Sequence, residues 1–290
     1  MLPNLLIIGA SKAGTTSLHH YLDQHPDITM AAPNGHLRGG NDDAPKEMRF
    51  FWRKDWQTRL AWYESHFEVS TPIRGEATPG YTQHPFLPHV PERIHSLVPD
   101  AKLVYIVRDP IDRIVASYVQ QYTDGDRRSF AERMSDCERP DHRLVCASRY
   151  ATQVERYLGL FDGSQLHVID QHDLRHDRET TLRELFVFLG VDPAFRSEAF
   201  AAERNARAEK FALTPTGRVL YDRVADPVGL RGAPRAWGRV RPRVRRAFSE
   251  PVVDRPVVDE ALRARLTAVL KPEVERLREL TGKRFASWSL

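Results

Sequence analysis

The stretch LLIIGASKAGTTSL, residues 5–18, has the residue types and spacing of a phosphate-binding loop, with one difference. The usual pattern is G-x-x-x-x-G-K-[ST], in which backbone N–H groups and a helix N-terminus hold phosphate oxygens. Gly9 and Gly14 keep the two-glycine spacing, but Lys12 stands inside the loop rather than after it. An ammonium group there can stabilise charge that grows on a leaving phosphate oxygen, so we expect group-transfer chemistry at this loop.

The hydroxyl groups that usually follow the second glycine are retained as Thr15, Thr16 and Ser17. In an NTP-binding loop such a hydroxyl holds Mg²⁺, together with an aspartate at the end of another strand. We find no apolar run that ends in a convincing aspartate of this kind. The sequence therefore predicts a phosphate site without a metal ion. The alternative is a tight strand-to-helix turn that binds no ligand.

Three short apolar runs, at 4–8, 102–107 and 166–170, predict the strands that position this loop. They are continuous rather than alternating, which is typical of parallel strands buried on both faces. Helices are expected after each of them, because amphipathic segments and capping residues follow. The expected helices cover about 15–23, 110–122, 148–161 and 177–189. This alternation predicts an α/β fold with a parallel sheet and helices on both faces.

Capping residues set several of these helix ends. Asp109 is expected to cap the second helix, with Pro110 at its first position, and Asp177 to cap the fourth, which Gly190 ends. Two helices at about 259–270 and 272–281 should close the chain, because Pro272 breaks the pattern between them and Gly282 stops the second.

No convincing boundary divides the sequence, so a single domain over residues 1–290 is expected. Two segments are predicted excursions on the substrate side, namely the Gly- and Pro-rich loop 32–46 and the region 214–257. The second contains an arginine-rich stretch, 231–246, that either folds over the site or forms a solvated face.

Composition limits the functional classes. Hydrophobic residues make up 41% and charged residues 28%, as in an ordinary globular protein. Cys137 and Cys146 lack metal-ligand spacing, and no apolar run reaches the roughly 20 residues of a membrane span. The start of the sequence lacks the basic region of a signal peptide, so a cytoplasmic protein is expected. The net charge of +4 favours an anionic ligand but does not indicate nucleic acid. The oligomeric state stays open.

Three stretches resemble sulfotransferases that use 3′-phosphoadenosine 5′-phosphosulfate (PAPS), especially heparan-sulfate-type and bacterial members. GASKAGTTSL resembles their 5′-phosphosulfate loop, LVYIVRDPIDRIVASYV their 3′-phosphate element, and PKEMRFF their K-E-x-x-F-F segment. GEATPGY and FVFLGV are similar to further segments, so the resemblance runs from residue 5 to about 191. It implies a P-loop NTPase-like, three-layer α/β/α fold, PAPS as sulfuryl donor, and no metal.

The resemblance also implies roles for individual residues. Lys12 would contact the leaving 5′-phosphate, and Arg108 would bind the 3′-phosphate. The family's serine eight residues after this arginine is Ala116 here, so that hydroxyl contact comes from the next residue, Ser117, or is absent. The donor-binding residues are therefore expected to be Lys12, Ala13, Gly14, Thr15, Thr16, Ser17, Arg108 and Ser117.

Glu47, in PKEMRFF, corresponds to the general base of the heparan-type relatives. Phe50 and Phe51 are expected to form an apolar wall beside it. His36 and His84 are the alternative bases. The acceptor is expected to be a hydroxyl group on a small molecule, carbohydrate or lipid, and the sequence does not decide between carbohydrate, lipid, phenol and peptide. A P-loop kinase, or a nucleotide-binding module that has lost catalysis, remains an alternative function.

Overall fold

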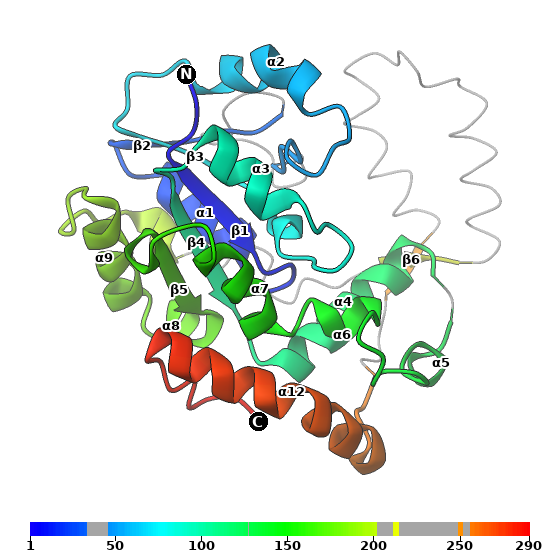
Figure 1. Cartoon of the computed structure of the whole chain (residues 1–290). Coiled ribbons are helices and arrows are strands. Elements are labelled where there is room, and N and C mark those ends of the chain that lie inside the picture. The colour runs from blue at the N-terminus through cyan, green and yellow to red at the C-terminus, as the bar shows by residue number, and fades with distance from the viewer. Residues whose placement is uncertain (34–45, 127, 202–210, 215–248, 252–255) are drawn as a thin grey trace. The chain divides into compact units, whose positions relative to one another are not determined.

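The computed structural model describes residues 1–33, 46–126, 128–201, 211–214, 249–251 and 256–290 (Figure 1). These residues divide into two compact units. The first comprises Met1–Ile114, Asp136–Ala206 and Glu260–Leu290, and the second comprises Val115–Ser135 and Arg207–Asp259. The predicted loop 32–46 and the region 214–257, with its arginine-rich stretch, lie almost entirely outside the described residues.

The first unit is built on a five-stranded parallel sheet with strand order β2-β3-β1-β4-β5. Its strands are β1 (Leu5–Gly9), β2 (Ile28–Met30), β3 (Ile73–Ala77), β4 (Lys102–Val107) and β5 (Leu166–Asp170). The three predicted strands are confirmed as β1, β4 and β5. Sequence reasoning missed β2 and β3, because β2 has only three residues and β3, IRGEA, contains an arginine, a glycine and a glutamate.

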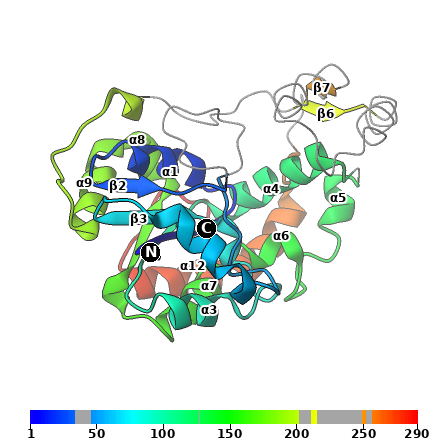
Figure 2. The same cartoon turned by 90° about the horizontal axis from the view of Figure 1, so that it is seen from above.

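Helices cover both faces of this sheet, which confirms the predicted three-layer α/β/α fold. Figure 2 shows the sheet between α1, α8 and α9 on one face and α3, α7 and α12 on the other. The bounds of the helices in this unit are α1 Thr15–Asp23, α2 Leu60–Glu64, α3 Val90–Leu97, α6 Arg143–Cys146, α7 Tyr150–Leu158, α8 Gln171–His176, α9 Arg178–Leu189 and α12 Glu260–Thr281. Short 3₁₀ turns lie at Gln57–Arg59, Ser65–Phe67, Pro79–Tyr81, Gly163–Gln165 and Glu198–Ala201.

The predicted side-chain cap of the fourth helix was wrong, although this helix begins where it was expected. Asp177 precedes α9, but its side chain makes no capping hydrogen bond. Instead, Asp170 at the end of β5 accepts a hydrogen bond from the N–H of His172, 2.9 Å away, and caps the additional helix α8. This aspartate after an apolar strand therefore serves as a helix cap.

The prediction that Pro272 separates two C-terminal helices was also wrong, because α12 continues through it. A proline removes one backbone hydrogen bond, and packing can outweigh that loss. Five apolar side chains of α12 are buried, and Glu273 accepts hydrogen bonds from the backbone N–H and the hydroxyl of Thr152 in α7, at 3.0 and 2.6 Å. Gly282 ends the helix as predicted, with φ 67°.

The helix α4, Pro110–Asp124, begins in the first unit and continues in the second. The second unit also contains α5, Phe130–Arg133, with a capping box formed by Ser129 and Glu132. The rings of Tyr118 and Phe130 pack there with centroids 4.9 Å apart. Two strands of the same unit, β6 (Phe211–Leu213) and β7 (Ser249–Pro251), pair in antiparallel fashion.

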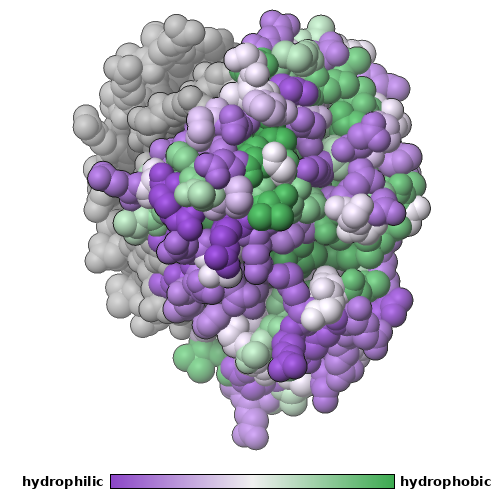
Figure 3. All heavy atoms as spheres, turned by 90° about the vertical axis from the view of Figure 1, so that its left-hand side faces the viewer, coloured by the Kyte–Doolittle hydropathy of each residue, from purple (hydrophilic) through white to green (hydrophobic). Residues whose placement is uncertain are grey.

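On the face shown in Figure 3, hydrophilic side chains surround smaller hydrophobic patches. Val187 of α9 is 63% exposed and is one of few large apolar side chains at the surface of the described residues. None of the described helices combines the length and the apolar character that crossing a membrane requires.

Candidate active site

The two glycines of the loop between β1 and α1 are required for different reasons. Gly9 has no room for a side chain, since a Cβ there would lie 2.0 Å from the hydroxyl of Thr82 and 2.5 Å from the ring of Tyr105. Gly14 has φ 102° and is the N-cap residue of α1, a conformation that residues with side chains rarely adopt. The spacing of these glycines therefore fixes a tight turn from strand to helix.

The N-terminus of α1 has the electrostatic character of an anion site. Its cap residue, Gly14, has no side chain to accept a hydrogen bond from the first-turn N–H groups, and the first turn contains no acidic residue. The helix dipole places partial positive charge at this end. Lys12 adds a full charge next to it and has φ 71°, the left-handed region. Ala13 and Thr15 are buried, while Thr16 and Ser17 are partly exposed.

Lys46 brings a second ammonium group to this helix. Its side chain is buried, and Nζ lies 3.4 Å from Oγ1 of Thr15 in the first turn of α1. The pKa of Lys46 is lowered to about 8, mainly because the side chain is buried. The carboxyl groups of Glu47 and Glu76 oppose this shift, and the charge of Lys12 adds to it. Nothing in the sequence indicates that the side chain of Lys46 is buried.

A buried carboxyl group fixes the segment that carries Lys46 and Glu47. Glu76 in β3 accepts hydrogen bonds from the hydroxyls of Tyr63, Thr78 and Tyr81, at 2.7, 2.7 and 2.9 Å. Two of these hydroxyls also accept hydrogen bonds from the backbone of the segment. The N–H of Arg49 donates to Thr78, and the N–H of Phe50 donates to Tyr81, both at 3.1 Å. Burial raises the pKa of Glu76.

Glu47 remains accessible, with 29% of its side chain exposed. Its carboxylate pairs with Nε of Arg49 at 3.0 Å. Phe50 and Phe51, the expected apolar wall, are both buried in the core, and their packing beside Glu47 stays a prediction. The ring of Phe50 stacks on Tyr63 at 3.9 Å, and that of Phe51 contacts Tyr81 at 5.7 Å.

Arg108 follows β4, the strand next to β1 in the sheet. Its guanidinium donates to the carboxylate of Asp112 at 2.7 Å, and 20% of its side chain is exposed. Its carbonyl accepts a hydrogen bond from the hydroxyl of Tyr150 at 2.8 Å. Tyr150 is itself buried and packs against Trp288, with ring centroids 5.7 Å apart. Tyr150 therefore supports the backbone at Arg108.

Asp109 caps α4 as predicted, with Pro110 at the first helical position. One carboxylate oxygen accepts the N–H groups of Ile111 and Asp112, each at 2.9 Å, and the other accepts that of Ser289 at 2.6 Å. The first N–H groups of α4 are therefore satisfied from within the chain. Ser117 is buried in the part of α4 that belongs to the second unit, so its contribution beside Arg108 stays a prediction.

The histidines offer little as bases. Burial lowers the pKa of His84, whose backbone N–H donates to Gln153 at 2.9 Å, and also that of His19, to about 3. The ring of His25 lies in the core, 4.8 Å from that of Phe186. His36 lies outside the described residues. Within the described parts of the chain, no group of three His, Cys, Asp or Glu side chains could hold a metal ion.

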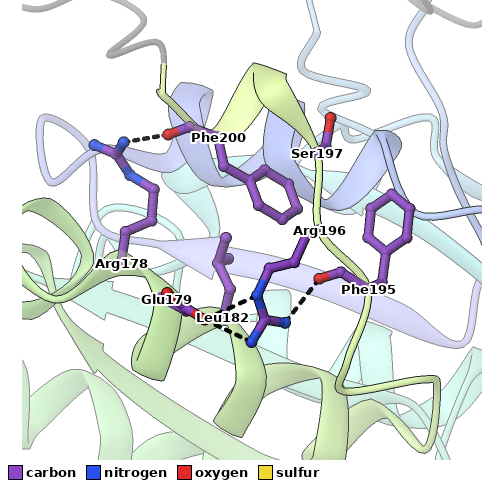
Figure 4. A pocket seen from close by; sticks show the side chains of 7 residues that line it. All are labelled: Arg178, Glu179, Leu182, Phe195, Arg196, Ser197 and Phe200. Atoms are coloured by element: carbon purple, nitrogen blue, oxygen red, sulfur yellow. Dashed lines mark hydrogen bonds and ion pairs between the residues drawn. The ribbon is translucent and has the colours of Figure 1, made fainter.

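A separate pocket of about 230 Å³ lies between α9 and the segment 195–200 and contains none of the predicted site residues (Figure 4). Its charged side chains are already paired. The guanidinium of Arg196 binds the carboxylate of Glu179 at 2.7 Å, and that of Arg178 donates to the carbonyl of Phe200. The anion-binding features therefore belong to α1 and β4 rather than to this pocket.

The parallel sheet carries a glycine loop with Lys12 between β1 and α1, and Arg108 follows the neighbouring strand β4. The particular family follows from comparison with known proteins. The model described as "Sulfotransferase family" matches residues 3–195, more than half of the chain. The chain belongs to this family and is a transferase, as the three sequence motifs predicted.

Two curated relatives are bifunctional heparan sulfate N-deacetylase/N-sulfotransferases. Enzyme 3 of Homo sapiens is 34% identical over 223 residues, which cover 70% of this chain and 24% of the relative. Enzyme 4 of Mus musculus is 33% identical over 214 residues, which cover 68% of this chain and 23% of the relative. The chain thus spans about a quarter of the length of these relatives. A sulfotransferase crystal structure from Alicyclobacillus acidocaldarius superposes with a TM-score of 0.66 at 25% identity, covering 100% of both chains.

Proposed function

We propose that this sulfotransferase moves the sulfuryl group of PAPS to a hydroxyl acceptor, with Lys12 at the leaving phosphate and Glu47 as general base. The observation that carries the proposal is the N-terminus of α1. There an uncapped helix start, a first turn without acidic residues, and Lys12 form an anion site at the end of a buried strand. Sulfuryl transfer is mainly positioning and charge stabilisation, which such a site supplies.

In the proposed reaction, the acceptor oxygen attacks sulfur in line with the bond to the 5′-phosphate. The new S–O bond forms, the old one breaks, and adenosine 3′,5′-bisphosphate leaves. Lys12 stabilises the charge that grows on the departing phosphate, while the backbone from Ala13 to Ser17 holds its other oxygens. The sulfuryl group carries less charge than a γ-phosphate, which is the reason for proposing no metal in this reaction.

Glu47 is proposed to take the acceptor proton. Its carboxylate is partly exposed and lies one residue after Lys46, which contacts α1. The ion pair with Arg49 uses Oε2, so Oε1 of the same carboxylate can take the proton while the pair is kept.

Arg108 is proposed to bind the 3′-phosphate of the donor. A guanidinium suits a terminal phosphate because it offers paired N–H donors in one plane. Asp112 competes for the same donors, so the phosphate must displace or share this carboxylate. Ser117 is proposed as an additional hydroxyl donor from α4.

The acceptor is proposed to be a carbohydrate, because the curated relatives are named heparan sulfate N-sulfotransferases. That name also indicates an amine acceptor, and Glu47 would serve either group, since both must lose a proton. Lipid and other small-molecule hydroxyls, a cytoplasmic location and a single functional domain over residues 1–290 remain predictions. Ala116, at the family's serine position, favours a second candidate, a nucleotide-binding module without catalysis.

One experiment separates these functions. The full chain is titrated calorimetrically with adenosine 3′,5′-bisphosphate, and then incubated with ³⁵S-labelled PAPS and a panel of carbohydrate hydroxyls and amines, without added metal. The proposal expects tight binding and transfer of label. Binding without transfer to any acceptor would support the inactive module. Absence of bisphosphate binding, with Mg²⁺-dependent binding of ATP, would instead identify a kinase.

A further inference from the structure

The ammonium group of Lys46 is buried and has few hydrogen-bond partners among the described residues. An ammonium has three N–H donors, and the partner found for Lys46 among the described residues is one hydroxyl, that of Thr15 at 3.4 Å. No carboxylate in the described parts of the chain forms an ion pair with it. Glu47 pairs with Arg49, and the oxygens of Glu76 accept three hydroxyl hydrogen bonds. A buried charge with so few partners destabilises the ligand-free fold.

The titratable groups that interact with Lys46 come from its own segment and from three others. Glu47 is its neighbour in the chain, Glu76 lies in β3, Lys12 lies in the loop, and His19 lies in α1. Burial lowers the pKa of His19 to about 3, so this ring is neutral near pH 7 and adds no positive charge. The remaining repulsion comes from Lys12. Lys46 contacts the first turn of α1 and Lys12 lies in the loop just before it, so two positive charges near one helix N-terminus favour an anion there.

We propose that Lys46 is a second cation of the donor site and binds the 5′-phosphate of the donor at the first turn of α1. This inference rests on the proposed function, because it assigns a further residue to the same site. Thr15, which contacts Nζ, lies in the first turn of α1, where the phosphate oxygens would meet the helix N–H groups. The ammonium therefore already lies at the place where the phosphate would bind.

Phosphate binding should raise the pKa of Lys46, because a nearby anion favours the charged form. The pKa in the free protein is about 8, so affinity should be full below pH 8 and should fall as the pH rises from 8 toward the raised value. Near pH 8 the protein should take up roughly half a proton per ligand bound. A lysine that only fills space would show no such uptake.

The test compares Lys46→Met with wild type by calorimetric titration at pH 7. Loss of one charge-assisted contact should weaken adenosine 3′,5′-bisphosphate about 10- to 100-fold. Adenosine 3′-phosphate, which lacks the 5′-phosphate, should bind both proteins equally. Titrations at pH 8 in buffers of different ionisation enthalpy should show proton uptake in wild type and none in Lys46→Met.

Two controls keep the result interpretable. Lys102→Met removes a half-buried lysine at the start of β4, whose Nζ donates to the carbonyl of Phe188 at 2.7 Å, and should bind both nucleotides like wild type. Lys46→Gln retains a donor toward Thr15 but no charge, and should behave like Lys46→Met. Without ligand, the melting temperature of Lys46→Met should equal or exceed that of wild type, because a desolvated charge has been removed.

Equal weakening of both nucleotides in Lys46→Met and Lys46→Gln, or unchanged bisphosphate affinity, would overturn the assignment of Lys46 to the 5′-phosphate while leaving the proposed function intact. If wild type itself does not bind the bisphosphate, the proposed function fails and this inference fails with it.

Discussion

The N-termini of α1 and α4 follow neighbouring parallel strands, but they differ in their capping residues and in the charged side chains near them. At α1 the cap is a glycine, the first turn has no acidic residue, and Lys12 and Lys46 supply charge. At α4 the cap is Asp109, which occupies the first N–H groups, and Asp112 already pairs with Arg108. An anion can therefore meet the helix backbone at α1, whereas at α4 only a side chain remains to bind it.

This contrast fits a donor with two different phosphates. The 5′-phosphate changes charge during transfer and needs fixed dipoles and a nearby cation. In the proposed reaction the 3′-phosphate takes no part in the chemistry, so its proposed recognition needs only the guanidinium of Arg108, which pairs with Asp112 and whose backbone carbonyl binds Tyr150. The comparison predicts that substitution of Lys12 mainly changes turnover, that substitution of Lys46 changes affinity through the 5′-phosphate, and that substitution of Arg108 changes affinity through the 3′-phosphate.

The largest effect is expected for Glu47→Gln, which keeps shape and hydrogen bonding but removes the base. Turnover with a hydroxyl acceptor should fall by about 10²–10⁴, because proton transfer to a positioned base typically contributes that much. Bisphosphate affinity, measured by calorimetry, should not change. The effect should be smaller for a phenol acceptor, whose pKa near ~10 eases proton loss. A variant that keeps its rate would place the base elsewhere, and His84 would then be tested.

Lys12→Ala should lower turnover by about 10²–10³, since a group that stabilises transition-state charge is removed, while bisphosphate binding stays detectable. Single-turnover transfer of labelled sulfate measures the loss. Lys12→Gly is a useful companion, because glycine adopts the φ of 71° without strain. It should be at least as stable as Lys12→Ala and equally inactive. Turnover near that of wild type in either variant would remove Lys12 from the mechanism.

Arg108→Ala should weaken adenosine 3′,5′-bisphosphate by about 10- to 100-fold, the value of a charge-assisted hydrogen bond. Adenosine 5′-phosphate, which lacks the 3′-phosphate, should be unaffected. This ligand preference is the reverse of that expected for Lys46→Met. If both ligands weaken equally, Arg108 supports the fold rather than the 3′-phosphate, and the contrast between the two helix starts no longer holds.

The smallest effect is expected for Asp112→Asn, which removes the carboxylate that competes for Arg108. Bisphosphate should bind a few-fold more tightly, because a half-exposed ion pair is worth roughly 0.2–1 kcal/mol. Adenosine 5′-phosphate is the control ligand, and its affinity should stay constant. Weaker bisphosphate binding in Asp112→Asn would show instead that the carboxylate holds Arg108 in its binding position.

Local sequence signals determined much of the architecture. The continuous apolar runs fixed β1, β4 and β5, because a strand buried on both faces needs no alternation. Gly14, Gly190 and the pair Asp109–Pro110 fixed helix ends, because their backbone preferences and capping chemistry act over a few residues. The glycine loop with its internal lysine identified the family for the same reason, since its geometry is encoded within one strand, turn and helix.

Tertiary structure alone decided the rest. The helix α12 continues through Pro272 because its apolar side chains and Glu273 are held by neighbours, which a local pattern does not contain. The tyrosine hydroxyls that bind Glu76 also hold the backbone at Phe50, and the rings of Phe50 and Phe51 lie in the core. Lys46, an ordinary charged residue in the sequence, becomes a desolvated ammonium at α1 only after residues 31 positions apart meet. Burial and partner choice depend on long-range packing, and this is why the second cation could not be read from the sequence.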